Sequence, residues 1–199
     1  MIATFLLNSK TIAQNIFQRI SNLKYPEKIW VLKHPFITPK TMKLSSLASK
    51  IASEAIEDKD MDGDYSGGQI DAFRHTLWMA LLAQKINPQK AYKLGVAHEK
   101  GNEIDYKKKN LEEGLLPDSV SCEMDLRNNN VGIEIGKKYK TASVEEMKII
   151  VKYAVIDGQC WKIKKDKDRT FLDENGNIIP EEEWKGKWIN PKVLVKSNY

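Results

Sequence analysis

The chain has few cysteines and no long hydrophobic run. Cys122 and Cys160 are too few for a disulfide framework and lack zinc-site spacing, so reduced thiols are expected, with one bridge as the alternative. No stretch approaches the roughly 20 apolar residues that cross a bilayer, so no transmembrane segment is expected. The N-terminal MIATFLLNSK has no preceding basic residue and no clear cleavage site, so we expect no secretory signal. Synthesis in the cytoplasm follows, and export would need a specialised secretion system.

Arginine is scarce in a basic chain. Only four of the 32 basic residues are arginine, and the formal net charge is +5. Arg74 and Arg127 stand within the polar motifs described below, where a planar guanidinium suits a carboxylate or a phosphate. The lysines are scattered, without a basic helix or interleaved aromatic residues, so nucleic-acid binding is not expected.

The length and composition fit one globular domain. The 199 residues include 41% hydrophobic and 30% charged residues, which is enough to build a single core. Apolar residues at helical spacing predict a mainly α fold, a multi-helix bundle-like domain with a small C-terminal β-hairpin. We divide it into residues 1–40 (a helix and a connector), residues 41–157 (the helical core with the site) and residues 158–199 (a hairpin and tail packed on the core).

Helical periodicity places the elements along the chain, and the segment 69–86 is apolar nearly all round, so it should be central. Prolines around Trp30, Leu32 and Phe36 predict an extended connector whose apolar side chains lie on the core. His34, beside one of these prolines, is interpreted as structural. The expected helices are 8–23, 41–57, 69–86, 89–101, 123–139 and 144–155; residues 102–120 are expected to form a loop, and 160–165 and 169–180 to form the hairpin strands.

An acidic stretch before the central helix, DKDMDGDYSGGQ, fits the loop of an EF-hand. Such a loop needs oxygen ligands at positions 1, 3, 5, 7, 9 and 12 and a glycine at position 6. Gln69 replaces the usual glutamate at position 12, and Tyr65 occupies position 8, so calcium should bind weakly, with a dissociation constant of about 10⁻⁴ to 10⁻³ M. A solvated turn that binds nothing is the alternative. The predicted calcium ligands are Asp58, Asp60, Asp62, Asp64, Ser66 and Gln69.

Polar residues recur on three of the expected helices. Asp71 and His75 are four residues apart and share a helix face, and Arg74 is three residues from Asp71. His98 continues an apolar stripe of the next helix, with Glu99 beside it. In the expected helix 123–139, one stripe is formed by Asp125, Asn129, Gly132 and Gly136. Its glycines should let this helix press against a neighbour and bring Asp125 toward both histidines.

These groups predict one of two chemistries. Two imidazoles and two carboxylates can ligate a second divalent metal and activate its water, or His98 and Glu99 can act as acid and base without a metal. Arg74 or Arg127 would then stabilise negative charge on a phosphate or acyl oxygen. The alternative is a buried polar network that joins three helices without catalysis.

Two family resemblances bear on this site. The order His, His-Glu, Asp on successive helices resembles HD-domain phosphohydrolases, although Glu99 replaces their aspartate and the spacings are short. A more extensive resemblance is to a bacterial domain family without assigned function that carries D-A-F-R-H-x-x-W, A-H-E and M-D-L-x-N-N-x-V-G blocks. The segments DAFRHTLW, VAHE and MDLRNNNVG match in that order, over about residues 30–140. The positions carried over are Asp71, Arg74, His75, Trp78, His98, Glu99, Asp125, Asn128 and Asn129.

That family occurs in secreted and toxin-like proteins. The resemblance therefore implies a bacterial source and an exported effector hydrolase, acting on an envelope polymer, a phospholipid or a phosphoester, with a cognate immunity or inhibitor protein as partner. The alternative is a calcium-binding envelope or interaction module with a buried polar network, in which Trp184 and Trp188 contact a ligand.

Overall fold

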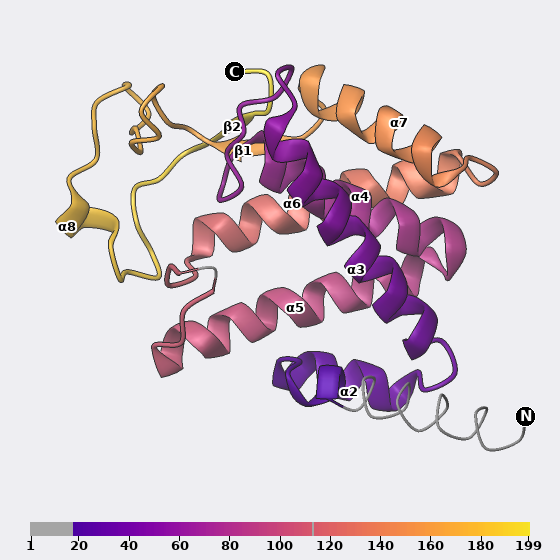
Figure 1. Ribbon diagram of the computed structural model, residues 1–199. Helices are drawn as coiled ribbons and strands as arrows, with labels where there is room; N and C mark the ends of the chain where they lie inside the picture. The colour runs from indigo at the N-terminus through magenta and orange to yellow at the C-terminus, as the bar shows by residue number, and fades with distance from the viewer. Residues whose placement is uncertain (1–17, 113) are drawn as a thin grey trace, which may run out of the picture.

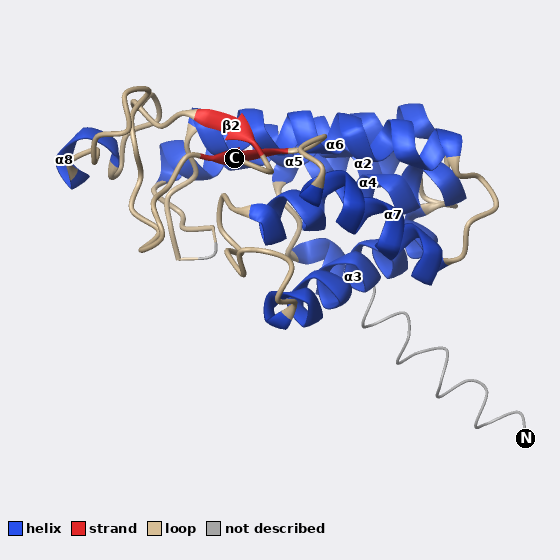
Figure 2. Cartoon of the chain, turned by 90° about the horizontal axis from the view of Figure 1, so that it is seen from above, coloured by secondary structure: helices blue, strands red, loops and turns tan. Residues whose placement is uncertain are grey.

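The computed structural model describes residues 18–112 and 114–199 and confirms a mainly α fold (Figures 1 and 2). Most of the helix expected over residues 8–23 lies outside the described residues. None of the described helices is long and apolar enough to cross a membrane. The elements are α2 (Tyr25–Lys33), α3 (Thr38–Glu54), the 3₁₀ turn η1 (Ala55–Glu57), α4 (Gln69–Lys85), α5 (Pro88–Lys108), α6 (Ser119–Lys138), α7 (Val144–Ile156), β1 (Trp161–Ile163), α8 (Glu181–Trp184) and β2 (Leu194–Lys196).

Helix α4 is the centre of the bundle, as its nearly continuous apolar sequence predicts. It packs against α3, α5, α6, α7 and β1, and twelve of its 17 residues are buried. Phe73, Leu77 and Leu81 face the main core between α3 and α7. Met79 and Leu82 face a second core toward α5 and α2. A polar side chain on α4 is therefore held in a fixed, largely dry setting.

The glycine stripe of α6 produces the closest helix packing in the site region. A Cβ on Gly132 would run into the backbone oxygen of Thr76, and one on Gly136 would meet that of Ala80. The two helices can approach only because both positions lack a side chain. The expected contact of α6 with a neighbouring helix is confirmed, and the neighbour is α4.

The connector expected around Trp30 is wrong, because this segment is helix α2. Pro26 lies in the first helical turn, where a missing N–H and a fixed φ are tolerated. Glu27 at position N3 accepts a hydrogen bond from the Lys24 backbone N–H at 2.8 Å, which caps the helix. Trp30 is buried as expected, but Leu32 is 75% exposed and Phe36 97% exposed.

Two helix boundaries also differ from the sequence expectation. Helix α5 continues through Gly101 to Lys108, and the side chain of Lys24 packs in the space that Gly101 leaves. Helix α6 begins at Ser119 because the Asp118 carboxylate accepts hydrogen bonds from Val120 N and Ser121 N, each 2.9 Å long. The loop expected over residues 102–120 is therefore short.

The two-stranded antiparallel sheet expected near the C-terminus is confirmed, but its second strand lies elsewhere. Strand β1 pairs with β2, whereas residues 165–178 form only isolated bridges. The chain between the strands extends away from the helices and carries α8 (Figure 1). Cys122 and Cys160 are buried free thiols, as expected.

Candidate functional site

Three side chains from two helices meet at one buried point. Asp71 and His75 project from the first half of α4, and Asp125 projects from the first half of α6. His75 Nε2 lies 3.5 Å from Asp71 Oδ1 and 3.4 Å from Asp125 Oδ1. All three residues are buried, with His75 only 2% exposed. This is the convergence that the α6 stripe predicts.

The spacing of these atoms suits a metal ion. Ligand atoms at about 2.0–2.2 Å from a tetrahedral ion stand about 3.3–3.6 Å from one another. In the part of the chain that the structure describes, Asp71, His75 and Asp125 are the one group of three acidic, histidine or cysteine residues whose ligand atoms lie within 4.8 Å of one another. Asp125 Oδ1 has no hydrogen-bond partner among the described residues. A cation would supply the partner that this buried oxygen lacks.

Arg74 and a backbone N–H hold the Asp71 carboxylate. Arg74 Nη2 donates to Asp71 Oδ1 at 2.6 Å, and Gly67 N donates to Asp71 Oδ2 at 2.7 Å. Arg74 also lies over the ring of Tyr65, 5.0 Å from its centroid. The carboxylate is thus fixed in orientation before any ligand binds.

His98 stands next to this group but does not join it. Its ring centroid is 6.3 Å from that of His75, and Trp78 packs edge-on against both rings. His98 Nδ1 lies 3.0 Å from Glu27 Oε1, and Nε2 lies 3.4 Å from Glu112 Oε1. His98 is therefore held between two carboxylates.

The two histidines have opposite charge states. Burial by itself lowers the pKa of His98, but contacts with Glu112 and Glu27 together have a larger, opposite effect. The pKa is therefore raised to about 10, and the ring is cationic at neutral pH. Burial, and next the charge of Arg74, lower the pKa of His75 well below its ordinary value. His75 is thus neutral, which leaves a lone pair on its ring for a ligand bond.

Burial raises the pKa of two acids, Asp125 in the site and Glu99 beside it. Burial, and next the charge of Glu99, raise the pKa of Asp125 well above its ordinary value. Burial also raises the pKa of Glu99, whose Oε2 accepts from Asn102 Nδ2 at 2.8 Å. Glu99 Oε1 has no hydrogen-bond partner among the described residues. The site therefore contains more carboxylates than nearby charged partners.

The remaining residues of the three motifs divide between site and scaffold. Asn129 lies against Gly95, so the neighbour expected to approach this glycine closely is a side chain and not a backbone. Asn128 pairs with the backbone of Trp161 through two hydrogen bonds of 2.9 Å and so anchors β1. Arg127 pairs with Glu123, stacks on Trp161 and lines neither of the hollows described below, so of the two expected arginines Arg74 is the one beside His75.

The acidic loop has the expected backbone form. Gly63 at position 6 has φ +64°, and Asp62 N donates to Gln69 Oε1 at 2.8 Å. Its carboxylates face lysines: Lys152 Nζ lies 2.6 Å from Asp58 Oδ2 and 2.7 Å from Asp60 Oδ2, Lys165 Nζ lies 2.6 Å from Asp64 Oδ2, and Ser66 O accepts from Lys165 at 2.5 Å. Calcium binding stays a prediction, and the ion would have to displace these ammonium groups.

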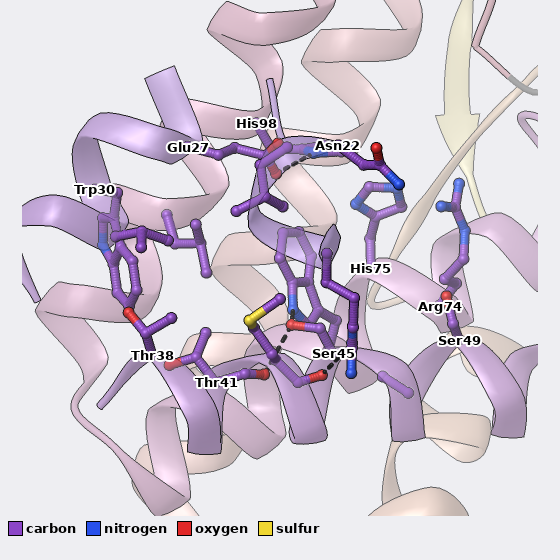
Figure 3. A pocket seen from close by; sticks show the side chains of 17 residues that line it. Asn22, Glu27, Trp30, Thr38, Thr41, Ser45, Ser49, Arg74, His75 and His98 are labelled. Atoms are coloured by element: carbon purple, nitrogen blue, oxygen red, sulfur yellow. Dashed lines mark hydrogen bonds and ion pairs between the residues drawn. The ribbon is translucent and has the colours of Figure 1, made fainter. Parts of the chain in front are cut away.

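Two hollows meet at His75. The apolar groove, lined by Trp30, Val31, Met42 and Leu94, has a volume of about 390 Å³. Figure 3 shows His75 and Arg74 on one side of this groove, and Trp30 and Thr38 on the opposite side. The polar cleft, about 180 Å³, is lined by Glu112, Asp118, Phe171, Trp184 and Lys192. Arg74, His75 and His98 line both hollows, and Asp71 and Asp125 line the polar cleft.

The sequence analysis missed two residues that decide the charge of the site. Glu27 is on α2 and Glu112 is in the turn after α5, so both lie outside the three motifs. Each becomes part of the site only by contacting His98 in three dimensions. Glu99 lines neither hollow, although the sequence analysis placed it at the reacting centre.

A known protein family matches the helical part of the chain. A family model described as a domain of unknown function (DUF6973) matches residues 28–159. This range contains most of α2 and all of α3 to α7, with Asp71, His75, Asp125, His98 and Glu112, whereas Glu27 lies one residue before it. No curated protein and no solved structure shows significant similarity to the chain.

Proposed function

The chain belongs to the DUF6973 family of domains of unknown function, and within that family we propose that it is a hydrolase whose divalent metal ion is held by Asp71, His75 and Asp125. The observation that carries the proposal is the position of two carboxylate oxygens 3.4 and 3.5 Å from one imidazole nitrogen. Nitrogen and oxygen ligands suit zinc or manganese. When bound, such an ion lowers the pKa of water and polarises an acyl or phosphoryl oxygen.

The residues around the ligands have separate parts in this reaction. Arg74 fixes Asp71 and adds positive charge beside the reacting atoms. His98, kept cationic by Glu27 and Glu112, faces the same hollows and stabilises negative charge that develops on the substrate. Trp78 keeps the two histidine rings apart and excludes water from one side of the site. Glu99 lines neither hollow and acts only through its charge, which raises the pKa of Asp125.

The test is metal binding compared with hydrolysis. We expect the metal-free protein to bind about one Zn²⁺ or Mn²⁺ per chain by calorimetry, and Asp125→Asn to weaken binding at least about 100-fold, since losing a second-shell partner alone costs 10- to 100-fold. Glu123→Gln, an exposed carboxylate on the same helix, is the matched control and should bind like the wild type. Equal affinity of wild type and Asp125→Asn would refute the metal site.

The same variants separate the two functional classes. In a hydrolase, loss of the ion abolishes cleavage of carboxylic or phosphate esters without unfolding the protein. If the three side chains form only a buried network of an interaction module, Asp125→Asn leaves every esterase and phosphoesterase rate at background, as in the wild type. We also propose that the protein is an exported effector. The wild type should then arrest the growth of target cells, and a cognate inhibitor should relieve this arrest. Asp125→Asn should cause no growth arrest.

A further inference from the structure

The two hollows on either side of His75 differ in chemistry. We infer that the substrate is a glycerophospholipid, with one acyl chain in the apolar groove, the phosphate headgroup in the polar cleft, and the carboxylic ester between them at His75. This rests on the proposed hydrolase function and names its substrate class. The groove volume of about 390 Å³ is in the range of natural ligand pockets.

Three hydroxyl groups in the wall of the apolar groove use their donors within the protein. Thr38 Oγ1 donates to His34 O at 2.9 Å, and Thr41 Oγ1 donates to Ile37 O at 3.0 Å. Ser45 Oγ donates to Thr41 O and accepts from the indole of Trp78 at 2.7 Å. Because these three donors are already bonded, a sugar or peptide gains no hydrogen bond from them when it loses its water contacts there. An alkyl chain has no such cost.

The outside of the groove is suited to a lipid surface. Helix α2 lines the groove with Trp30 and Val31. The same helix and the turn after it expose Leu32 and Phe36, at 75% and 97%. Exposed lysines adjoin them, at Lys33 and Lys40. Large exposed apolar side chains beside cationic ones favour attachment to an anionic lipid interface.

The polar cleft complements a phosphate once the ion is bound. Its lining has four cationic side chains, at Arg74, His98, Lys185 and Lys192, and four carboxylates, at Asp71, Glu112, Asp118 and Asp125. Among the described residues these charges balance, so a bound divalent ion adds the positive charge that a phosphate would face. Lys192 also lies over the rings of Phe171 and Trp184, 4.0 and 4.7 Å from their centroids, so its ammonium group is held at the cleft wall.

The reaction that follows from this placement is ester hydrolysis. A water oxygen bonds to the acyl carbonyl carbon, and the bond from that carbon to the glycerol oxygen breaks. The proton from water passes to the glycerol oxygen. The products are a fatty acid, which leaves through the apolar groove, and a lysophospholipid.

Tryptophan fluorescence tests acyl binding separately from catalysis. The probe is a monomeric lysophospholipid with a brominated acyl chain, added to metal-free protein, because bromine quenches Trp30 and Trp78 only if the chain enters the groove. We expect saturable quenching, with affinity rising about fourfold for each added methylene until the groove is filled. Val31→Phe, which narrows the groove, should weaken binding at least tenfold. Ile149→Phe, at an exposed position on α7 that lines neither hollow, should leave affinity unchanged.

The outcomes distinguish this inference from the proposed function. Quenching without lipid hydrolysis by the metal-loaded protein keeps the acyl site and overturns the hydrolase. Hydrolysis of small esters without saturable quenching keeps the hydrolase and overturns the phospholipid. If Val31→Phe fails to fold, the chain-length series on the wild type decides, because affinity independent of chain length would refute the groove.

Discussion

The charge state of His98 is a prediction that needs no knowledge of the substrate. We consider His98→Gln, which removes the cation but keeps a side chain of similar length. Glu27 and Glu112 would then lose their shared partner, although Lys24 Nζ still lies 2.6 Å from Glu112 Oε1. Breaking a buried ion pair from one side costs about 3–5 kcal/mol, because a charge stays buried without its partner.

The structure also supplies the size and pH dependence of this loss. The pKa of His98 rises from 6.5 to about 10 on folding, because the effect of the two carboxylates exceeds that of burial. A group whose pKa rises on folding stabilises the protein when it is protonated. For His98 this stabilisation is complete below about pH 6.5 and is lost above about pH 10. At pH 7, which is about three pH units below the folded pKa, the remaining stabilisation is about 4 kcal/mol. For a chain of this size that lowers the melting temperature by about 10 °C.

The assay is urea unfolding of wild type and His98→Gln at several pH values from 6 to 10. We expect the difference in unfolding free energy to be largest near pH 6 and to fall steadily as the pH rises. His34→Gln is the control for loss of an imidazole, because His34 stacks on Trp30 and forms no ion pair among the described residues. A His98→Gln difference that does not change with pH would refute the reasoning.

Two further predictions concern packing and calcium. Gly132→Ala should destabilise the protein by about 1–3 kcal/mol in urea unfolding, because its Cβ meets the Thr76 backbone oxygen; a gain of about 1 kcal/mol, as for an exposed helical glycine, would contradict the close packing of α6 on α4. Calcium at 10 mM should raise the melting temperature by about 3–5 °C if the dissociation constant is about 10⁻³ M. Lys152→Met should strengthen this effect because it removes the ammonium group between Asp58 and Asp60, whereas no shift in either protein would contradict the calcium site.

The sequence predicted those parts of the fold that depend on local periodicity and on glycine. Helix α4 was expected at 69–86 and lies at 69–85. A long apolar segment that starts after two glycines and ends before Asn87-Pro88 favours a buried helix with these ends. The approach of α6 to another helix followed from Gly132 and Gly136. Proline was less informative: Pro26 lies in the first turn of α2, because a proline is compatible with the start of a helix as well as with an extended segment.

The sequence by itself determined which polar groups lie on the buried faces of α4, α5 and α6, because helical spacing assigns each residue to a face. It therefore predicted that Asp125 approaches His75, which shares a helix face with Asp71. Only the tertiary structure decided that His98 faces Glu27 and Glu112 rather than an ion, that Arg127 points away, and that an apolar groove opens beside His75. Those features depend on side chains far apart along the chain, whose distances no local pattern determines.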